Sequence, residues 1–452
     1  MSRGNMILAA FFFNPQGDHR ASWRHPRAPG QEFMDFDYYR RLVGAAEAAK
    51  IDTIFIADHL GIWNGLGSGV AHYANPRLEP LSLVTALSAV TQDIGFMVTA
   101  STSYTEPFNT ARIFASMDHI SGGRVAWNVV TSALEEEAMN YGRDANLDHA
   151  VRYERAAEFL DVAKALWDSW EDDAVALDKA SGLFAHPEKV HFLHHVGKHF
   201  RVRGPLNVTR PPQGHPVIVQ AGSSEAGKNL AAQHAEVHFA VLRNQADGIA
   251  YRADMDARLA RFGRTPASFK QIPGILPIVA ETASEAEEKQ HYLESLMIDE
   301  LAVDLLSTWA GVDLSAYPLD GPIPDLPEEA NYNGWRTWLA LVRDKSNEGL
   351  SIRQLARKIS ATGSVPLIAG TPSQVADQLE AWFVSGAADG FNLMFPLLPD
   401  DWMNFMRTVV PELQRRGLFR TEYEGRTLRD RLGLTRPANG FSAAADAASR
   451  SA

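Results

Sequence analysis

The chain has 452 residues, of which 45% are hydrophobic and 22% charged, and it contains no cysteine. This composition is typical of a globular protein, and the lack of cysteine excludes disulfides, thiolate nucleophiles and cysteine-based metal sites. The formal net charge of −12 argues against a nucleic-acid-binding protein, because phosphate contacts need clustered Lys and Arg. No apolar run reaches the ~20 residues of a membrane helix. We therefore expect a soluble cytoplasmic protein without a membrane or nucleic-acid partner.

Short apolar runs alternate with helical patterns from the start of the chain. In the first half, the pattern predicts strands at 7–13, 53–57, 94–100 and 125–130, and helices at 37–50, from 80, at 107–117 and at 153–170. The first run follows Arg3 and superficially resembles a signal peptide. It is short and is not followed by a small-residue cleavage pattern, so we interpret it as a buried strand.

The same alternation continues in the second half. It predicts strands at 217–220, 237–240, 271–280 and 390–395, and helices at 225–233, 245–262, from 284 and at 399–415. Irregular segments at about 171–214 and 301–348 read as insertions, and the proline density of the second indicates a surface excursion rather than core. Eight alternations predict an α/β protein, a single TIM-type (β/α)₈ barrel with insertions over residues 1–436. The Ala- and Ser-rich segment 437–452 is expected to be disordered.

A barrel of this kind places its site at the carboxyl ends of the strands. The turn Gly222-Ser223-Ser224 follows a predicted strand and precedes a helix, so its backbone N–H groups and two hydroxyls could hold a phosphate. Equally, either serine could be only a helix N-cap. By contrast, Thr371-Pro372-Ser373-Gln374 matches a capping box, and we interpret it as structural.

Histidines offer two further candidates. His149 and Tyr153 are four residues apart and share one face if the helix begins by His149, which makes them a second phosphate candidate. A histidine-rich segment at 191–199 fits no standard zinc spacing, and we interpret it as part of a polar insertion. We expect no metal site.

Several motifs give the chain a resemblance to a known family. They are Trp23-Arg24-His25-Pro26 and the segments 55–58, 99–104, 121–132, 152–155, 166–170 and 220–227. In order and spacing they resemble the FMNH₂-dependent two-component monooxygenases of the bacterial-luciferase-like superfamily. Within it, the similar group is that of nitrilotriacetate, dibenzothiophene sulfone and long-chain alkane monooxygenases. The resemblance covers about residues 5–436, and none of the motifs is specific for a substrate.

The resemblance implies reduced FMN as a diffusible co-substrate, O₂, and a separate NAD(P)H:flavin reductase that needs no stable complex. It also implies a homo-oligomer, a dimer or a tetramer. The cofactor-binding residues that it implies are Asp58, Ser101, Thr102, Asn128, His149, Tyr153, Ser223 and Ser224. We expect His19 to act as the catalytic hydrogen-bonding residue, although a structural loop histidine is the alternative, and Phe13 and Trp63 to contact the substrate.

The function that follows is oxygenation of a small organosulfur, aminopolycarboxylate, aromatic or halogenated compound. Two alternatives use the same barrel: a flavin- or deazaflavin-dependent dehydrogenase, and a flavin-binding protein without catalysis. A metal hydrolase is a further alternative, but the first loop lacks the His-x-His that such barrels carry.

Overall fold

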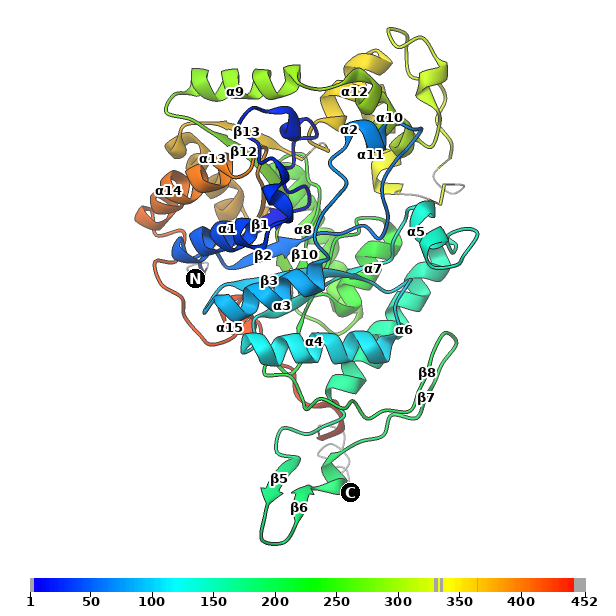
Figure 1. Cartoon of the computed structure of the whole chain (residues 1–452), viewed down its shortest axis with the longest axis vertical. Helices are drawn as coiled ribbons and strands as arrows, with labels where there is room; N and C mark the ends of the chain where they lie inside the picture. Colours follow the sequence, from blue (N-terminus) through cyan, green and yellow to red (C-terminus); the bar gives the residue numbers. More distant parts are fainter. Residues whose placement is uncertain (1–3, 329–331, 334–335, 364, 443–452) are drawn as a thin grey trace.

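Parallel strands form a closed barrel in the computed structural model, which describes residues 4–328, 332–333, 336–363 and 365–442 (Figure 1). The barrel strands are β1 (Ile7–Phe12), β2 (Thr53–Ile56), β3 (Gly95–Ser101), β4 (Val125–Val130), β9 (Val217–Gln220), β10 (Val237–His238), β11 (Lys270–Gln271) with β12 (Gly274–Val279), and β14 (Gly390–Met394). The predicted TIM-type barrel is therefore confirmed.

The barrel closes through its first and last strands. β1 pairs in parallel with both β2 and β14. The predicted seventh strand is broken at Pro273, which has no N–H to donate, so β11 pairs with β10 and β12 pairs with β14. Backbone bonds bridge the break, because Ile272 N–H donates to His238 O (2.9 Å) and Asn392 N–H donates to Pro273 O (2.9 Å).

Alternating side chains of β1 divide between the barrel interior and the surrounding helices. The Phe11 ring packs inside, 5.4 Å from the ring of Phe55. The Phe12 ring faces outward and stacks 4.7 Å from Trp402. A strand has a side-chain period of two, so only alternate rings of the Phe11–Phe13 run can face the interior.

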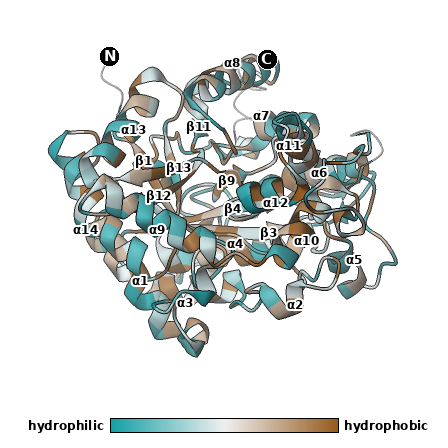
Figure 2. Cartoon of the chain, turned by 90° about the horizontal axis from the view of Figure 1, so that it is seen from above, coloured by the Kyte–Doolittle hydropathy of each residue, from teal (hydrophilic) through white to brown (hydrophobic). Residues whose placement is uncertain are grey.

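Helices of the described part of the chain surround the strands (Figure 2). They are α1 (Phe36–Ala48), α3 (Pro80–Val90), α4 (Pro107–Ser121), α6 (His149–Trp167), α7 (Glu225–His234), α8 (Gln245–Arg261), α13 (Pro372–Ser385) and α14 (Asp400–Arg415). No helix of the described residues is long and apolar enough to cross a bilayer.

One position in this ring of helices is filled by a different helix from the one that the sequence predicted. The helix expected from residue 284 is α9 (Ala283–Ser295), which packs on an additional strand, β13 (Leu367–Gly370), beside β12. The ring position between α8 and α14 is taken by α13, whose N-terminus is the Thr371 capping box predicted above. Periodicity shows that a segment is helical but not which neighbours it packs against.

The proline density of the second insertion predicted a surface excursion, but only part of the segment is irregular. It contains α10 (Asp299–Ala310), which packs on α12 (Ile352–Ser360) above the barrel in Figure 1, and α11 (Arg336–Ser346) follows the proline-rich stretch. The two helices share a buried apolar cluster that includes Leu301, Leu305, Leu306, Trp309, Ile352, Leu355 and Ile359. The prolines lie between α10 and α11. The helices on either side of them are therefore free to form and to bury this separate apolar cluster.

The first insertion forms two hairpins that project from the barrel (Figure 1). They are β5 (Val175–Asp178) with β6 (Leu183–Ala185), and β7 (His195–Val196) with β8 (Arg201–Val202). The start of the tail expected to be disordered packs near them: the Asn439 amide donates to Asp168 O (2.8 Å), and Arg210 donates to Pro437 O (2.8 Å). Residues 437–442 are thus held by polar contacts, and 443–452 lie outside the described residues.

The amino end of the barrel is plugged by the chain that follows α14. Leu428 begins a short helix, α15 (Leu428–Arg431), and packs with Leu432 and Leu434 against the interior cluster. Gly95 at the start of β3 leaves the room that Leu428 fills, since a Cβ there would lie 2.6 Å from the leucine methyl. The opposite, carboxyl end of the strands is therefore the end left for a site.

Candidate active site

Hydroxyl and amide side chains line the carboxyl ends of β3 and β4. The Ser101 and Ser132 hydroxyls lie 2.9 Å apart, and the Thr102 hydroxyl donates to Val130 O. The Asn128 amide donates to the Thr99 hydroxyl at 2.8 Å, while its buried Oδ1 has no hydrogen-bond partner among the described residues. Ser101, Thr102 and Asn128 are thus brought together, with a buried acceptor available to a ligand.

The predicted phosphate turn lies at the end of β9. The Ser224 hydroxyl accepts from Gly227 N–H (3.1 Å), so Ser224 is the N-cap of α7 as well as a candidate ligand. A Cβ at Gly222 would lie 2.8 Å from the Tyr153 hydroxyl and 2.5 Å from the Gln220 amide. The Gly222 turn and Tyr153, which were predicted as separate phosphate candidates, therefore lie side by side. The glycine lets the polar side chains of Tyr153 and Gln220 approach the backbone.

Two residues behind this turn were not predicted. Tyr251 on α8 hydrogen-bonds the Ser223 hydroxyl, and the Tyr251 hydroxyl lies 2.8 Å from His238 Nε2. Burial raises the pKa of Tyr251 and lowers that of His238 to about 3, so both stay neutral near neutral pH. They hold Ser223 in place. The packing of α8 on α7 brings Tyr251 there, and the pairing of β10 with β9 brings His238.

α6 begins at His149, so His149 and Tyr153 share one face and their ring centroids lie 4.7 Å apart. The backbone N–H of His149 donates to the Asn333 side chain of the second insertion (2.9 Å). Arg152 is buried, and it donates to Asn333 O (2.6 Å) and to Ser132 O. The insertion is thus attached directly to the start of α6, beside the predicted phosphate residues His149 and Tyr153.

The loop after β1 buries two titratable side chains, Asp18 and His19. Burial lowers the pKa of His19 to about 4, so its ring is neutral near neutral pH. Its Nδ1 accepts from Ala21 N–H (3.2 Å), whereas Nε2 has no partner in the described part of the chain. A ring fixed at one nitrogen and open at the other can hydrogen-bond a ligand.

Asp18→Asn is expected to stabilise the fold increasingly as the pH rises from about 4 to about 8. Burial raises the Asp18 pKa from its ordinary 3.8 to about 8, against the opposing charge of Arg20. Between these values only the folded chain holds the proton, so wild-type stability falls by up to roughly 1.4 kcal/mol per pH unit. Asparagine does not titrate. Urea unfolding at several pH values measures the difference between the two proteins.

The exposed Asp37, whose pKa is lowered by Arg40, provides a control, and Asp37→Asn should give no such gain. A difference between Asp18→Asn and wild type that stays constant from pH 5 to pH 8 would mean that Asp18 is ionised in the folded protein.

The loop after β2 carries Asp58, His59 and Trp63. Burial raises the Asp58 pKa to about 6, with Arg77 opposing the shift. The Phe13 ring lies 4.9 Å from the His59 ring at the barrel mouth. Trp63 is buried in the cluster of the second insertion, 5.3 Å from the Tyr73 ring. Phe13 and Trp63 were both expected to contact the substrate. Phe13 lies at the barrel mouth, whereas Trp63 is buried in the cluster of the second insertion, and a substrate role for either stays a prediction.

Two arginines of this region, Arg20 and Arg77, were not singled out from the sequence. Their positions after β1 and β2 were a usable signal, because barrel sites are built from these loops. Trp23 and Arg24, two residues of the motif that carries the family resemblance, lie instead at exposed positions.

The histidines of the first insertion pair with glutamates. His191 lies 2.8 Å from Glu171, and His195 lies 3.0 Å from Glu158. Within the described ranges, no group of three or more His, Asp or Glu side chains is placed to hold a metal ion.

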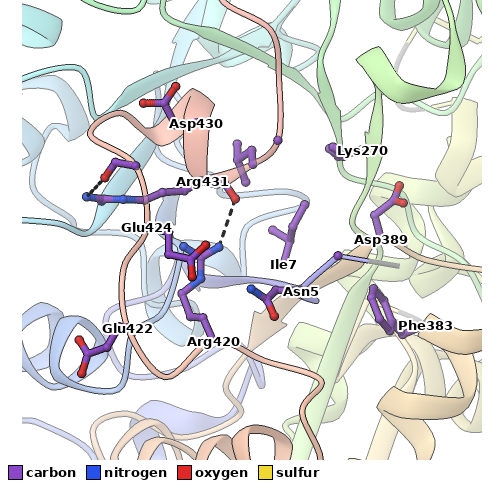
Figure 3. A pocket seen from close by; sticks show the side chains of 14 residues that line it. Asn5, Ile7, Lys270, Phe383, Asp389, Arg420, Glu422, Glu424, Asp430 and Arg431 are labelled. Atoms are coloured by element: carbon purple, nitrogen blue, oxygen red, sulfur yellow. Dashed lines mark hydrogen bonds between the residues drawn. The ribbon is translucent and has the colours of Figure 1, made fainter. Parts of the chain in front are cut away.

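A cavity of about 430 Å³ lies at the amino end of the barrel (Figure 3), whereas the candidate site residues lie at the carboxyl ends of the strands. Charged side chains line it, among them Lys270, Asp389, Arg420 and Arg431. Arg420 is already paired with Asp52 (2.5 Å) and donates to Arg431 O. Because the amino face of such barrels serves stability, we place the site at the opposite face despite this cavity.

The sequence matches the family described as luciferase-like monooxygenase over residues 8–389. It is 46% identical to nitrilotriacetate monooxygenase component A of Aminobacter aminovorans, covering 97% of this chain and 99% of the relative. It is 44% identical to N-acetyl-S-(2-succino)cysteine monooxygenase of Bacillus subtilis (strain 168), covering 97% and 99%. Among solved structures, a riboflavin lyase with modified FMN and riboflavin superposes with a TM-score of 0.86 at 31% identity, covering 95% of this chain and 96% of that one.

Proposed function

We propose that this chain, which belongs to the luciferase-like monooxygenase family and is a flavin-dependent monooxygenase, uses reduced FMN and O₂ to oxygenate a small organic compound. One oxygen atom would enter the substrate and the other would leave as water, with two electrons from the flavin. The observation that carries this proposal is the Gly222 turn, where Tyr153 and the N-terminus of α7 meet. The substrate would be an organosulfur, aminopolycarboxylate, aromatic or halogenated compound.

The residues at the carboxyl ends of the strands fit FMN. Ser223, Ser224, Tyr153 and His149 would hold the phosphate, where a helix N-terminus favours an anion and a Cβ at Gly222 would fill the space. Ser101, Thr102, Asn128 and Asp58 would contact the ribityl chain and the ring system. The unpartnered Oδ1 of Asn128 supports this placement, because a buried acceptor without a partner is costly unless a ligand supplies a donor.

When bound, the flavin supplies the oxygen chemistry, and the protein supplies orientation, hydrogen bonds and exclusion of water. His19, neutral and open at Nε2, would hydrogen-bond the reacting oxygen or the substrate. Asn333 and Arg152 hold the second insertion against the site, which supports the exclusion of water from the flavin.

We further propose that a separate NAD(P)H:flavin reductase delivers the reduced flavin by diffusion. The relative named as component A supports a separate partner component. A reductase that uses NAD(P)H would share the compartment, which favours the cytoplasm. We also propose a homo-oligomer, a dimer or a tetramer, which sedimentation of the purified chain would test.

The test of the flavin function is stopped-flow absorbance. Anaerobic protein with FMNH₂ is mixed with oxygenated buffer, and the formation of oxidised flavin is followed. We expect flavin oxidation to be slower than in the protein-free control, because bound FMNH₂ is shielded from solvent. Oxidation at the control rate, together with no FMNH₂ binding in an equilibrium titration, would exclude the flavin function. Oxygen consumption during substrate turnover would distinguish this monooxygenase from a dehydrogenase on the same barrel.

A further inference from the structure

Two arginine side chains converge at the barrel mouth, over the ring of Phe13. The guanidinium carbon of Arg77, in the loop between α2 (Gly69–His72) and α3, lies 4.1 Å from the Phe13 ring centroid. That of Arg20, in the loop after β1, lies 5.9 Å from the same centroid and 5.6 Å from the Tyr73 ring. Two cations from different loops thus share one apolar surface at the carboxyl end of the strands.

Neither guanidinium forms an ion pair within the described part of the protein. Among the described residues, no carboxylate lies within ion-pair distance of Arg20 or Arg77, and Arg20 Nε, Arg20 Nη1 and Arg77 Nη1 are buried without a hydrogen-bond partner. Arg77 Nε donates to Asn75 O (3.2 Å). A buried N–H of a charged group is costly when it has no acceptor. These donors therefore point to an anionic ligand that supplies the acceptors.

The ionisable neighbours of the two arginines cancel only part of this positive charge. Asp18, His19, Asp58 and His59 interact electrostatically with one or both arginines. Burial raises the Asp18 pKa to about 8, so its carboxyl is largely neutral at pH 7, and burial lowers the pKa of His19 and His59, so both rings are neutral. Of these neighbours, only Asp58, with a pKa of about 6, carries a charge at pH 7. One carboxylate then faces two cations.

We propose that Arg20 and Arg77 form a subsite for a carboxylate of the substrate, so that the compound oxygenated is a small organic acid bound as its anion. A planar guanidinium matches a carboxylate in a two-pronged hydrogen-bonded pair. The Phe13 ring beneath the arginines would pack against the apolar part of the same molecule. This proposal rests on the proposed function and narrows its substrate class.

The phosphate of FMN is a second anion that these arginines could bind, but the topology argues against it. The Gly222 turn follows β9, whereas Arg20 and Arg77 lie in the loops after β1 and β2, and β3 and β4 stand between them in the barrel. The phosphate candidate and the arginine pair are thus on separate sectors of the barrel mouth, as a flavin and a substrate require.

The test is anaerobic calorimetric titration of the FMNH₂-loaded protein with succinate and with nitrilotriacetate, each beside its uncharged amide. We expect at least one acid to bind ten times more tightly than its amide. Arg77→Gln and Arg20→Gln should each weaken binding of that acid about tenfold without changing the affinity for FMNH₂. The lysine variants, which keep the charge, should recover part of the loss. Arg112→Gln, at an exposed position of α4, is the matched control and should bind like wild type.

Thermal unfolding of each variant shows that the fold is intact. The proposal is overturned if neither acid is preferred over its amide, or if both glutamine variants bind the acid as wild type does. It is also overturned if the glutamine variants lose FMNH₂ instead, which would assign the arginines to the flavin. If the wild-type protein binds the acid through these arginines but does not bind FMNH₂, the carboxylate subsite is supported. The same result would contradict the proposed flavin function.

Discussion

Gly227→Ala is expected to lower the affinity for FMNH₂ by about a hundredfold. A Cβ at Gly227 would lie 2.5 Å from Gly222 O and 2.7 Å from Gly222 C, so it meets backbone rather than a flexible side chain. The first turn of α7 and the phosphate turn would have to separate. Overpacking of this kind costs about 1–3 kcal/mol, and ~3 kcal/mol at the cradle corresponds to the hundredfold loss. Fluorescence or absorbance titration under anaerobic conditions measures the affinity.

Gly222→Ala is a milder change in the same place. Its Cβ would meet the ends of two side chains, Gln220 and Tyr153, which can move aside. We expect a fold of wild-type stability and an FMNH₂ affinity reduced about tenfold, because the Tyr153 hydroxyl is displaced from the phosphate. Gly44→Ala is the matched control for Gly227→Ala, because Gly44 is also a helical glycine, on α1, but has open space around it. This control should leave FMNH₂ binding unchanged. Wild-type affinity in both Gly222→Ala and Gly227→Ala would move the phosphate site elsewhere.

Arg429→Met is expected to destabilise the folded protein by about 3 kcal/mol, because it leaves the largely buried Glu236 without its main counter-charge. Arg429 is buried in the plug at the amino end of the barrel and pairs through both terminal nitrogens with Glu236 (Nη2 to Oε2, 2.9 Å). It also donates to His215 O (2.9 Å), which joins the C-terminal segment to the barrel. Urea unfolding at pH 7 measures the loss, and Arg415→Met, in an exposed pair with Glu412, should cost less than about 1 kcal/mol.

The pH dependence separates the ion pair from simple packing. Burial acts to raise the Glu236 pKa, but the charge and hydrogen bonds of Arg429 outweigh it, and the pKa is lowered. The stabilisation from this pair is therefore full above the ordinary glutamate pKa and is lost as the pH falls toward the lowered value. The gap between wild type and Arg429→Met should narrow in acid. A gap that stays constant down to pH 3 would assign the loss to packing alone.

Much of the fold follows from local patterns. Strand and helix alternation and the capping box at Thr371 are effects of neighbouring residues, so they were predicted from the sequence. The same holds for the N-cap at Ser224 and for the shared face of His149 and Tyr153, since both depend on spacing within one helix. These local features placed the predicted flavin residues at one end of the barrel. The break at Pro273 is also a local effect, but the predicted strand at 271–280 ran through it.

Contacts between distant segments could be decided only by the tertiary structure. The sequence gives no sign that α13 rather than α9 completes the helix ring, that Tyr251 supports Ser223, or that Asn333 reaches the start of α6. The same is true of Arg20 and Arg77, because whether a guanidinium finds a carboxylate depends on which loops meet in space. Local preference acts within a few residues, whereas burial, ion pairing and an unpartnered charge arise only when the barrel brings separate loops to one mouth.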